Sequence, residues 1–102
     1  MRPTTLVEGE VLIGDRDVNS YVLALQTQAG RTNRLIVKAR GKRIPKAIDI
    51  VEYSLRKFLT GWEKGIVVVG TEERPPPWPD EDLADKGRVS FIYIALHQGD
   101  NS

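Results

Sequence analysis

Cysteine is missing from the 102-residue chain, and histidine and methionine occur once each. The absence of cysteine excludes disulfides, thiolate metal sites and cysteine nucleophiles, and it fits an intracellular protein. No apolar run approaches the roughly 20 residues needed to span a bilayer, and the opening MRPTTLVEGE lacks the apolar region of a signal peptide. We therefore expect no membrane contact and a cytoplasmic location.

Residues with catalytic potential are equally scarce. His97 has no aspartate or cysteine near it in the sequence, so a surface histidine is the simpler interpretation. The acidic run 80–82 lacks the alternating oxygen ligands, inner glycine and closing glutamate of an EF-hand. Gly41-Lys42 resembles the end of a phosphate-binding P-loop, but the upstream glycine is absent and Arg43 replaces the serine or threonine. The sequence predicts no enzyme, no cofactor and no metal site.

Charge is abundant instead, and it is unevenly distributed. Residues 1–60 hold 11 Lys/Arg against 6 Asp/Glu, a net of +5, whereas residues 61–102 hold 4 against 8, a net of −4. The overall charge of +1 hides this division. A basic first part followed by an acidic second part predicts a polyanionic partner for one face of the molecule.

The spacing of apolar residues predicts strands that alternate with helices. One helix should begin at its N-cap Asp17 and close at Gly30 as a C′ glycine, and a second should begin at Pro45 and end at Gly61. The order predicts one α/β domain over residues 1–102. Its elements should follow in the order β-α-β-α-β-β, with a parallel first pair of strands. The expected strands cover residues 6–13, 35–39, 65–70 (a buried strand) and 88–96.

A long segment at about 71–87 separates the last two predicted strands. It is too long for a tight hairpin, and its prolines cannot join a strand ladder, so we expect an exposed, extended arm. Pro76 and Pro79 have the PxxP spacing of polyproline II ligands. A stiff loop is the simpler interpretation of that stretch.

The basic loop KARGKRIPKA, residues 38–47, joins the second strand to the second helix. Five of its first nine residues are basic and none is acidic. A strand-to-helix connection places backbone N–H groups at the positive end of the helix dipole, and Gly41 lets the backbone approach a phosphate closely. These features predict a binder of the phosphate backbone that does not read base edges. A merely solvated basic loop remains the alternative on composition alone.

KARGKRIPKAIDIVE resembles the signature of the Alba family, the small archaeal chromatin proteins that bind DNA and RNA. VLIG at 11–14, YVLA at 21–24 and the basic residues up to Phe58 follow the order and spacing of that family. The resemblance covers roughly residues 8–70 and, more loosely, the last strand.

The resemblance implies a two-layer β-α-β-α-β-β sandwich with a four-stranded mixed sheet and two helices, like the C-terminal domain of a translation initiation factor. It also implies a homodimer, or a heterodimer with an Alba paralogue, whose basic loops face double-stranded DNA or RNA and whose hairpin arms reach along the minor groove. The implied contacts between dimers are Tyr21 and Phe58, although spacing alone fits a core position for Phe58 equally well. The candidate nucleic-acid-binding residues are Arg16, Lys38, Arg40, Lys42, Arg43, Lys46, Arg74, Lys86 and Arg88.

The turn after VLIG departs from the family pattern. A lysine pair followed by proline, which carries the reported acetylation switch, is replaced by Asp15-Arg16-Asp17. Asp17 fits as a helix N-cap, whereas Asp15 has no structural role that the sequence reveals and should repel phosphate next to the basic loop. Because the arm is also acidic, the chain would suit a divergent second paralogue that pairs with a more basic one.

Three functions remain open. The first is sequence-nonspecific binding of double-stranded DNA through its backbone, with a role in chromatin compaction or organisation, a chromosome-associated location and additional RNA binding. The second is an RNA-binding subunit of a ribonucleoprotein such as ribonuclease P. The third is a heterodimer partner that modulates a more basic Alba paralogue. Affinities for duplex DNA and structured RNA at one salt concentration separate the first two, and co-expression tests the third.

Overall fold

The chain folds into two layers, a sheet and a pair of helices. The structure, a computed structural model, describes residues 8–73 and 88–99. No helix within these two ranges is long and apolar enough to cross a bilayer. The elements in chain order are β1 (Glu10–Leu12), α1 (Val18–Ala29), β2 (Arg34–Arg40), the 3₁₀ turn η1 (Gly41–Arg43), α2 (Ile44–Lys57), β3 (Trp62–Glu73) and β4 (Arg88–Gln98). The predicted α/β class is confirmed.

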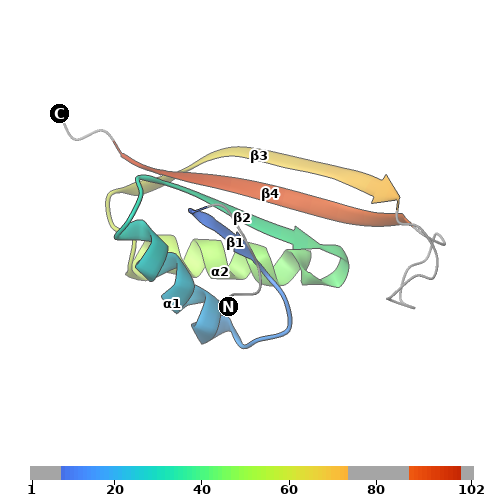
Figure 1. The fold of residues 1–102 in the computed structure, drawn as a ribbon, viewed down its shortest axis with the longest axis horizontal. Coiled ribbons are helices and arrows are strands. Elements are labelled where there is room, and N and C mark those ends of the chain that lie inside the picture. Colours follow the sequence, from blue (N-terminus) through green and yellow to red (C-terminus); the bar gives the residue numbers. More distant parts are fainter. Residues whose placement is uncertain (1–7, 74–87, 100–102) are drawn as a thin grey trace.

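The four strands form one mixed sheet in the order β1-β2-β4-β3. β1 and β2 run parallel, as predicted, and β4 pairs antiparallel with β2 and with β3. Both helices lie on one side of this sheet, and the opposite side is bare in the part of the chain that is described (Figure 1). The loops that follow β1 and β2 lie at the same end of the sheet, because parallel strands point the same way.

The core lies between the helices and the facing side of the sheet. Its largest fully buried apolar side chains come from α1, α2 and the two central strands. The alternation of buried and exposed residues along β2 and β4 is that of strands covered on one face only. The side chains that share this core include Val22, Leu25, Leu35, Val37, Ile50, Val51, Ile94 and Leu96.

The helix ends follow the prediction in part. Asp17 is the N-cap of α1, and its carboxylate accepts hydrogen bonds from the backbone N–H of Ser20 at 3.2 Å and from the Ser20 hydroxyl at 2.6 Å. α1 closes at Gly30, as predicted, but Gly30 is the C-cap residue with φ −77°, a right-handed conformation, and not a C′ glycine. The second helix ends at Lys57, and Gly61, with φ +86°, forms the turn that leads into β3.

The prediction of a buried strand at 65–70 was wrong. β3 is a 12-residue edge strand that pairs with β4 alone among the described strands, and its middle is exposed on both faces. The physical reason is that an edge strand has a neighbour on one side only, and the helices leave it uncovered. β3 also continues to Glu73, into the predicted arm. The rest of that arm, with its PxxP spacing and acidic run, lies outside the described residues.

Candidate nucleic-acid interface

The turn between β1 and α1 is held to the start of α2 by Lys46 and to α1 by Tyr21. The Lys46 ammonium donates hydrogen bonds to the carbonyl oxygens of Gly14, at 2.9 Å, and of Arg16. The Tyr21 hydroxyl accepts from the backbone N–H groups of Gly14 at 2.8 Å and Arg16 at 3.1 Å. Lys46 also lies 5.2 Å from the centre of the Tyr21 ring, where the ring's electrons attract the cation. The turn and the basic loop therefore meet at one end of the sheet.

Asp15 has a structural role that the sequence did not reveal. Its carboxylate accepts hydrogen bonds from Nε of Arg43 at 3.1 Å and from Nη2 at 2.5 Å, which ties the turn to η1. These hydrogen bonds and the guanidinium charge hold the pKa of Asp15 below its usual value of 3.8, and the charges of Lys46 and Lys42 act in the same direction. Asp15 is therefore the counter-ion of a cation that we predicted to bind phosphate.

Two more of the predicted basic residues, Lys38 and Arg40, project from β2 onto the bare side of the sheet. The ammonium of Lys38 lies 3.2 Å from the carboxylate of Glu10 on β1. Nε of Arg40 lies 2.9 Å from the carboxylate of Glu72 on β3, so this pair crosses over β4. Both pairs are partly accessible to solvent. The structure therefore separates these two cations from the cations at the start of α2.

The remaining predicted cations are placed as follows. Arg16 and Lys42 are exposed, Arg16 in the β1–α1 turn and Lys42 in η1, and Arg88 is exposed at the start of β4. Arg74 and Lys86 lie outside the described residues. Arg16, Lys42 and Arg43 thus come from the two loops at the same end of the sheet, where Arg43 reaches across to the turn. We call these three residues the basic end.

The start of α2 adds a partial positive charge to the basic end. The N-cap residue Arg43 makes no side-chain cap hydrogen bond, Pro45 occupies the first turn, and η1 precedes the helix directly. Gly41 opens η1 with φ +59°, a conformation that favours glycine, and a Cβ there would come within 3.4 Å of Val89. Exposed cations beside a helix N-terminus are suited to phosphate, because the N–H groups and the dipole attract an anion.

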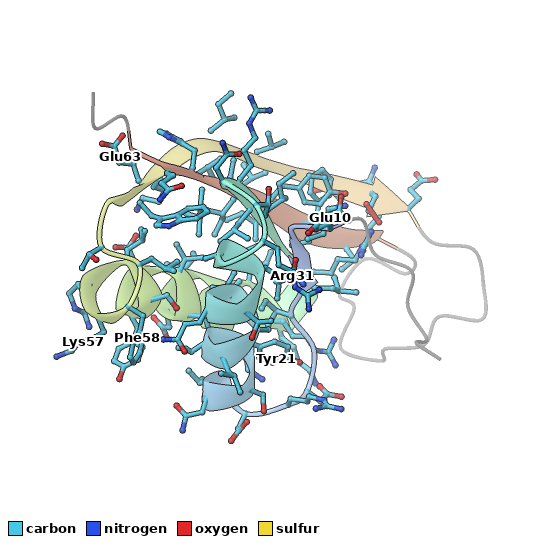
Figure 2. The ribbon with its side chains drawn as sticks, turned by 60° about the vertical axis from the view of Figure 1, so that its left-hand side comes forward. Glu10, Tyr21, Arg31, Lys57, Phe58 and Glu63 are labelled. Carbon is cyan, nitrogen blue, oxygen red and sulfur yellow. The ribbon has the colours of Figure 1, made fainter. Side chains whose placement is uncertain are left out.

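The two aromatic residues predicted for contacts between dimers have different surroundings. Tyr21 is only 8% exposed, so little of its surface is left for another subunit. Phe58 is 45% exposed, which resolves the choice between core and surface in favour of the surface. It lies just beyond the last turn of α2, on the side away from the sheet, and its ring meets the Tyr53 ring edge-on at 5.8 Å (Figure 2).

Comparisons with known proteins give a consistent result. The family model described as Alba matches residues 9–71. The chain belongs to the Alba family. It is 37% identical to the DNA/RNA-binding protein Alba of Picrophilus torridus over 87% of this chain and 94% of that protein. It is 36% identical to the protein of the same name from Methanoculleus marisnigri over 87% of this chain and 92% of that one. Among solved structures, Alba from Thermoplasma volcanium superposes with a TM-score of 0.74 at 32% identity, covering 87% of this chain and 99% of that chain.

The Alba match covers the basic loop and the turn before α1, and it ends inside β3. What sequence reasoning missed is the set of acidic partners, Glu10, Asp15 and Glu72. Each lies 28 or 32 residues from the cation it contacts. A signal for the first pair existed, because Glu10 and Lys38 both lie on the expected parallel pair of strands. The pairing of Asp15 with Arg43 needed the loop geometry.

Proposed function

We propose that this Alba chain binds double-stranded DNA without sequence preference, and RNA as well, through the phosphate backbone at its basic end. The observation that carries the proposal is the gathering of Arg16, Lys42 and Arg43 beside the uncapped N-terminus of α2. Its relatives in the family are named as DNA/RNA-binding proteins, which supports the same class of ligand. Organisation of the chromosome, and association with it, is the role that we propose for such binding.

Carboxylates within the protein should make its binding to nucleic acid weaker than its number of basic residues implies. Asp15, Glu10 and Glu72 each neutralise a cation that a phosphate would otherwise contact. Binding must then exchange a carboxylate for a phosphate. This arrangement fits the alternative in which the chain works as the less basic partner of a heterodimer and adjusts the affinity of a more basic Alba paralogue.

A dimer interface is proposed along β3. Val67 and Val69 pair with Ile94 and Ile92, which are buried against the helices, so the two valines point to the helix side of the sheet. They are nevertheless 46% and 68% exposed, because β3 is an edge strand. An exposed apolar edge is an interaction site or an aggregation hazard, and a second Alba subunit would cover it. Phe58 lies apart from this edge and supplies the proposed contact between dimers.

The salt dependence of DNA binding tests the proposed role of the basic end. Each phosphate contact releases a counterion, so the logarithm of affinity falls by about 0.9 per contact for each unit of log salt. The double variant Arg16→Ala/Lys42→Ala should weaken binding equally on unrelated duplexes and flatten that slope by roughly 2 per protomer. Fluorescence anisotropy titrations at several salt concentrations measure both quantities.

The matched control is the double variant Arg56→Ala/Lys57→Ala. It removes the same charge from the last turn of α2, at the opposite end of the helix from η1. Its affinity and slope should stay close to those of the wild type. If both double variants lose the same amount, net charge rather than the basic end governs binding. If the basic-end variant loses affinity on one sequence only, backbone binding is the wrong mechanism.

A further inference from the structure

The bare side of the sheet carries an aromatic pair that the proposed function does not use. Phe91 and Tyr93 lie two residues apart on the central strand β4, so their side chains point to the same face. Their ring centres are 5.0 Å apart, and the ring planes differ by 37°. Both side chains are partly exposed. We propose that this face binds single-stranded nucleic acid by stacking unpaired bases on Phe91 and Tyr93.

The neighbouring strands leave room for these rings. Gly70 on β3 pairs with Phe91, and a Cβ at Gly70 would come within 2.8 Å of the tip of the Phe91 ring. The absence of a side chain therefore allows Phe91 to extend over the edge strand. Val68, which pairs with Tyr93, is 45% exposed beside the second ring. A four-stranded sheet whose exposed aromatic residues stack two or three bases is an established way of recognising single-stranded RNA.

Cations border the rings on the other side. Lys38 pairs with Tyr93 in the sheet register, and its ammonium lies 5.1 Å from the centre of that ring. Arg40 pairs with Phe91 in the same register. Each cation can exchange its carboxylate partner for a phosphate, because an ammonium has three N–H donors and a guanidinium has five. Adjacent residues would thus bind the bases over the rings and the phosphates beside β2.

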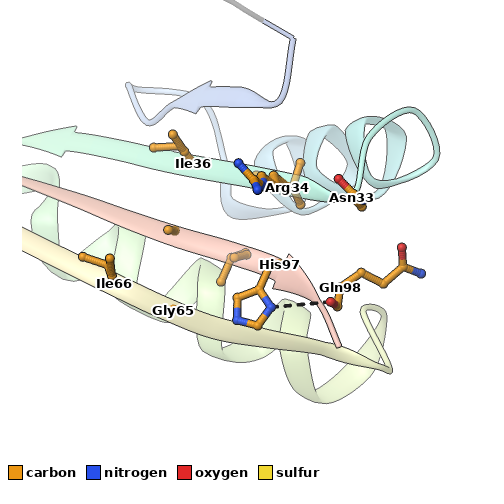
Figure 3. A pocket seen from close by; sticks show the side chains of 10 residues that line it. Asn33, Arg34, Ile36, Gly65, Ile66, His97 and Gln98 are labelled. Carbon is orange, nitrogen blue, oxygen red and sulfur yellow. Dashed lines mark hydrogen bonds between the residues drawn. The ribbon is translucent and has the colours of Figure 1, made fainter. Parts of the chain in front are cut away.

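An open hollow extends the aromatic pair along β4. It has a volume of about 640 Å³ and lies between the ends of the strands, with Ile36, Ile66, Ala95 and His97 among its lining residues (Figure 3). Ala95 and His97 follow Tyr93 on the same face, since alternate residues of a strand share a side. The hollow therefore offers space for the nucleotides that follow a base stacked on Tyr93.

Charge and stacking together favour single-stranded nucleic acid over a protein on this face. A protein that covered Lys38 and Arg40 would remove two ion pairs from water, which is costly. A nucleic acid replaces the carboxylates with phosphates and leaves the site hydrated. A duplex hides the faces of its bases inside the stack, so aromatic rings can stack only on unpaired bases. These residues are not the basic end, so the two proposals can fail independently.

Binding of a labelled single-stranded oligouridylate tests the proposal, with a DNA duplex of equal length in parallel. The double variant Phe91→Leu/Tyr93→Leu keeps apolar bulk on the sheet but removes the stacking surface. We expect its affinity for oligouridylate to fall about tenfold or more, and its duplex affinity to change by less than about twofold. Tyr53→Leu, which removes an exposed ring from α2, is the matched control and should bind both probes as the wild type does.

A second variant keeps the test decisive if the double variant does not fold. Val68→Glu places a carboxylate beside Tyr93 on an exposed position and should also weaken oligouridylate binding, whereas Leu23→Glu on α1 should not. Wild-type affinity of Val68→Glu for oligouridylate would overturn the proposal. The proposal would also be overturned if the wild-type protein did not bind oligouridylate and Val68→Glu reduced self-association in light scattering. The face would then be a protein contact. Equal losses on both probes with the aromatic double variant would also overturn the proposal.

Discussion

Arg43 and Lys46 show how differently two neighbouring cations of one loop are used. The Lys46 ammonium points inward to two carbonyl oxygens of the β1–α1 turn, whereas Arg43 extends to the exposed carboxylate of Asp15. Both residues were predicted as phosphate contacts from the same motif. Sequence gives the number of positive charges, but the direction of each side chain depends on acceptors far away in the chain.

Asp15→Asn tests whether an internal carboxylate restrains DNA binding. The substitution keeps the shape of the side chain and removes the charge that neutralises Arg43. We expect tighter binding to duplexes of any sequence, most clearly at low salt, and a salt slope steeper by up to about 0.9 per protomer. Anisotropy titrations at two salt concentrations provide the comparison. Asp49→Asn, in the middle of α2, is the control, and an unchanged affinity in Asp15→Asn would mean that Arg43 does not meet phosphate.

The stability of the same pair has a definite pH dependence. Arg43 lowers the pKa of Asp15 in the folded protein below its usual value of 3.8, so the ionised carboxylate favours folding. This stabilisation is fully present above about pH 4 and is lost as the pH falls through the lower, folded-state pKa. Asp15→Asn should therefore melt at a lower temperature than the wild type at pH 7. The difference should shrink in melts recorded near pH 3, and a constant difference would contradict the assignment.

At the scale of elements, the Lys46 ammonium contributes to the docking of the β1–α1 turn on α2. Lys46→Met keeps the aliphatic stem and removes the donor to the Gly14 and Arg16 carbonyls, so it should lower the free energy of unfolding by about 1–3 kcal/mol. Lys57→Met, at an exposed position in the last turn of α2, should cost little stability. Urea unfolding of the two variants makes the comparison. If Lys46→Met were as stable as the wild type, Lys46 would be a phosphate contact, as predicted from the sequence.

The order and type of the elements could be predicted because their signals are local. The N-cap at Asp17, the apolar spacing of both helices and the parallel first pair of strands are all confirmed. β3 could not be predicted in the same way. GIVVVG has the composition of a buried strand, and the same composition serves an edge strand that exposes Val67 and Val69. Which of the two occurs depends on whether a helix or another subunit covers the strand.

The candidate site was predictable in composition and less so in arrangement. All five cations of the basic loop lie at or near the β2–α2 junction. Their division between the bare sheet face and the helix terminus follows from strand alternation, which puts Lys38 and Arg40 on the side opposite the core. The counter-ions could not be predicted, because contacts across 28 to 32 residues leave no local pattern.

At the scale of the whole molecule, the proposed functions lie on separate surfaces. The basic end lies where β1 and β2 lead into the helices, the aromatic pair lies on the bare face, and the apolar edge of β3 points to the helix side. Phe58 lies at the far end of α2 from the basic end. A dimer formed along β3 would leave the other three surfaces accessible, so dimer formation and cooperative DNA coating can be separated by substitution.

Val69→Lys tests the dimer, and Phe58→Ala tests the contact between dimers. A lysine at Val69 would bury a charge in the proposed interface, so light scattering should report a monomer, while Leu23→Lys on α1 should keep the wild-type mass. Because Phe58 is exposed, Phe58→Ala should keep both the wild-type mass and nearly the wild-type melting temperature. It should bind short duplexes normally yet lose cooperative coating of long DNA, seen as a non-cooperative series of bands in gel shifts. If the wild-type chain were monomeric alone and dimeric only when co-expressed with a more basic Alba paralogue, the functional dimer would be the heterodimer. Cooperative coating by Phe58→Ala would instead place the contact between dimers elsewhere on the surface.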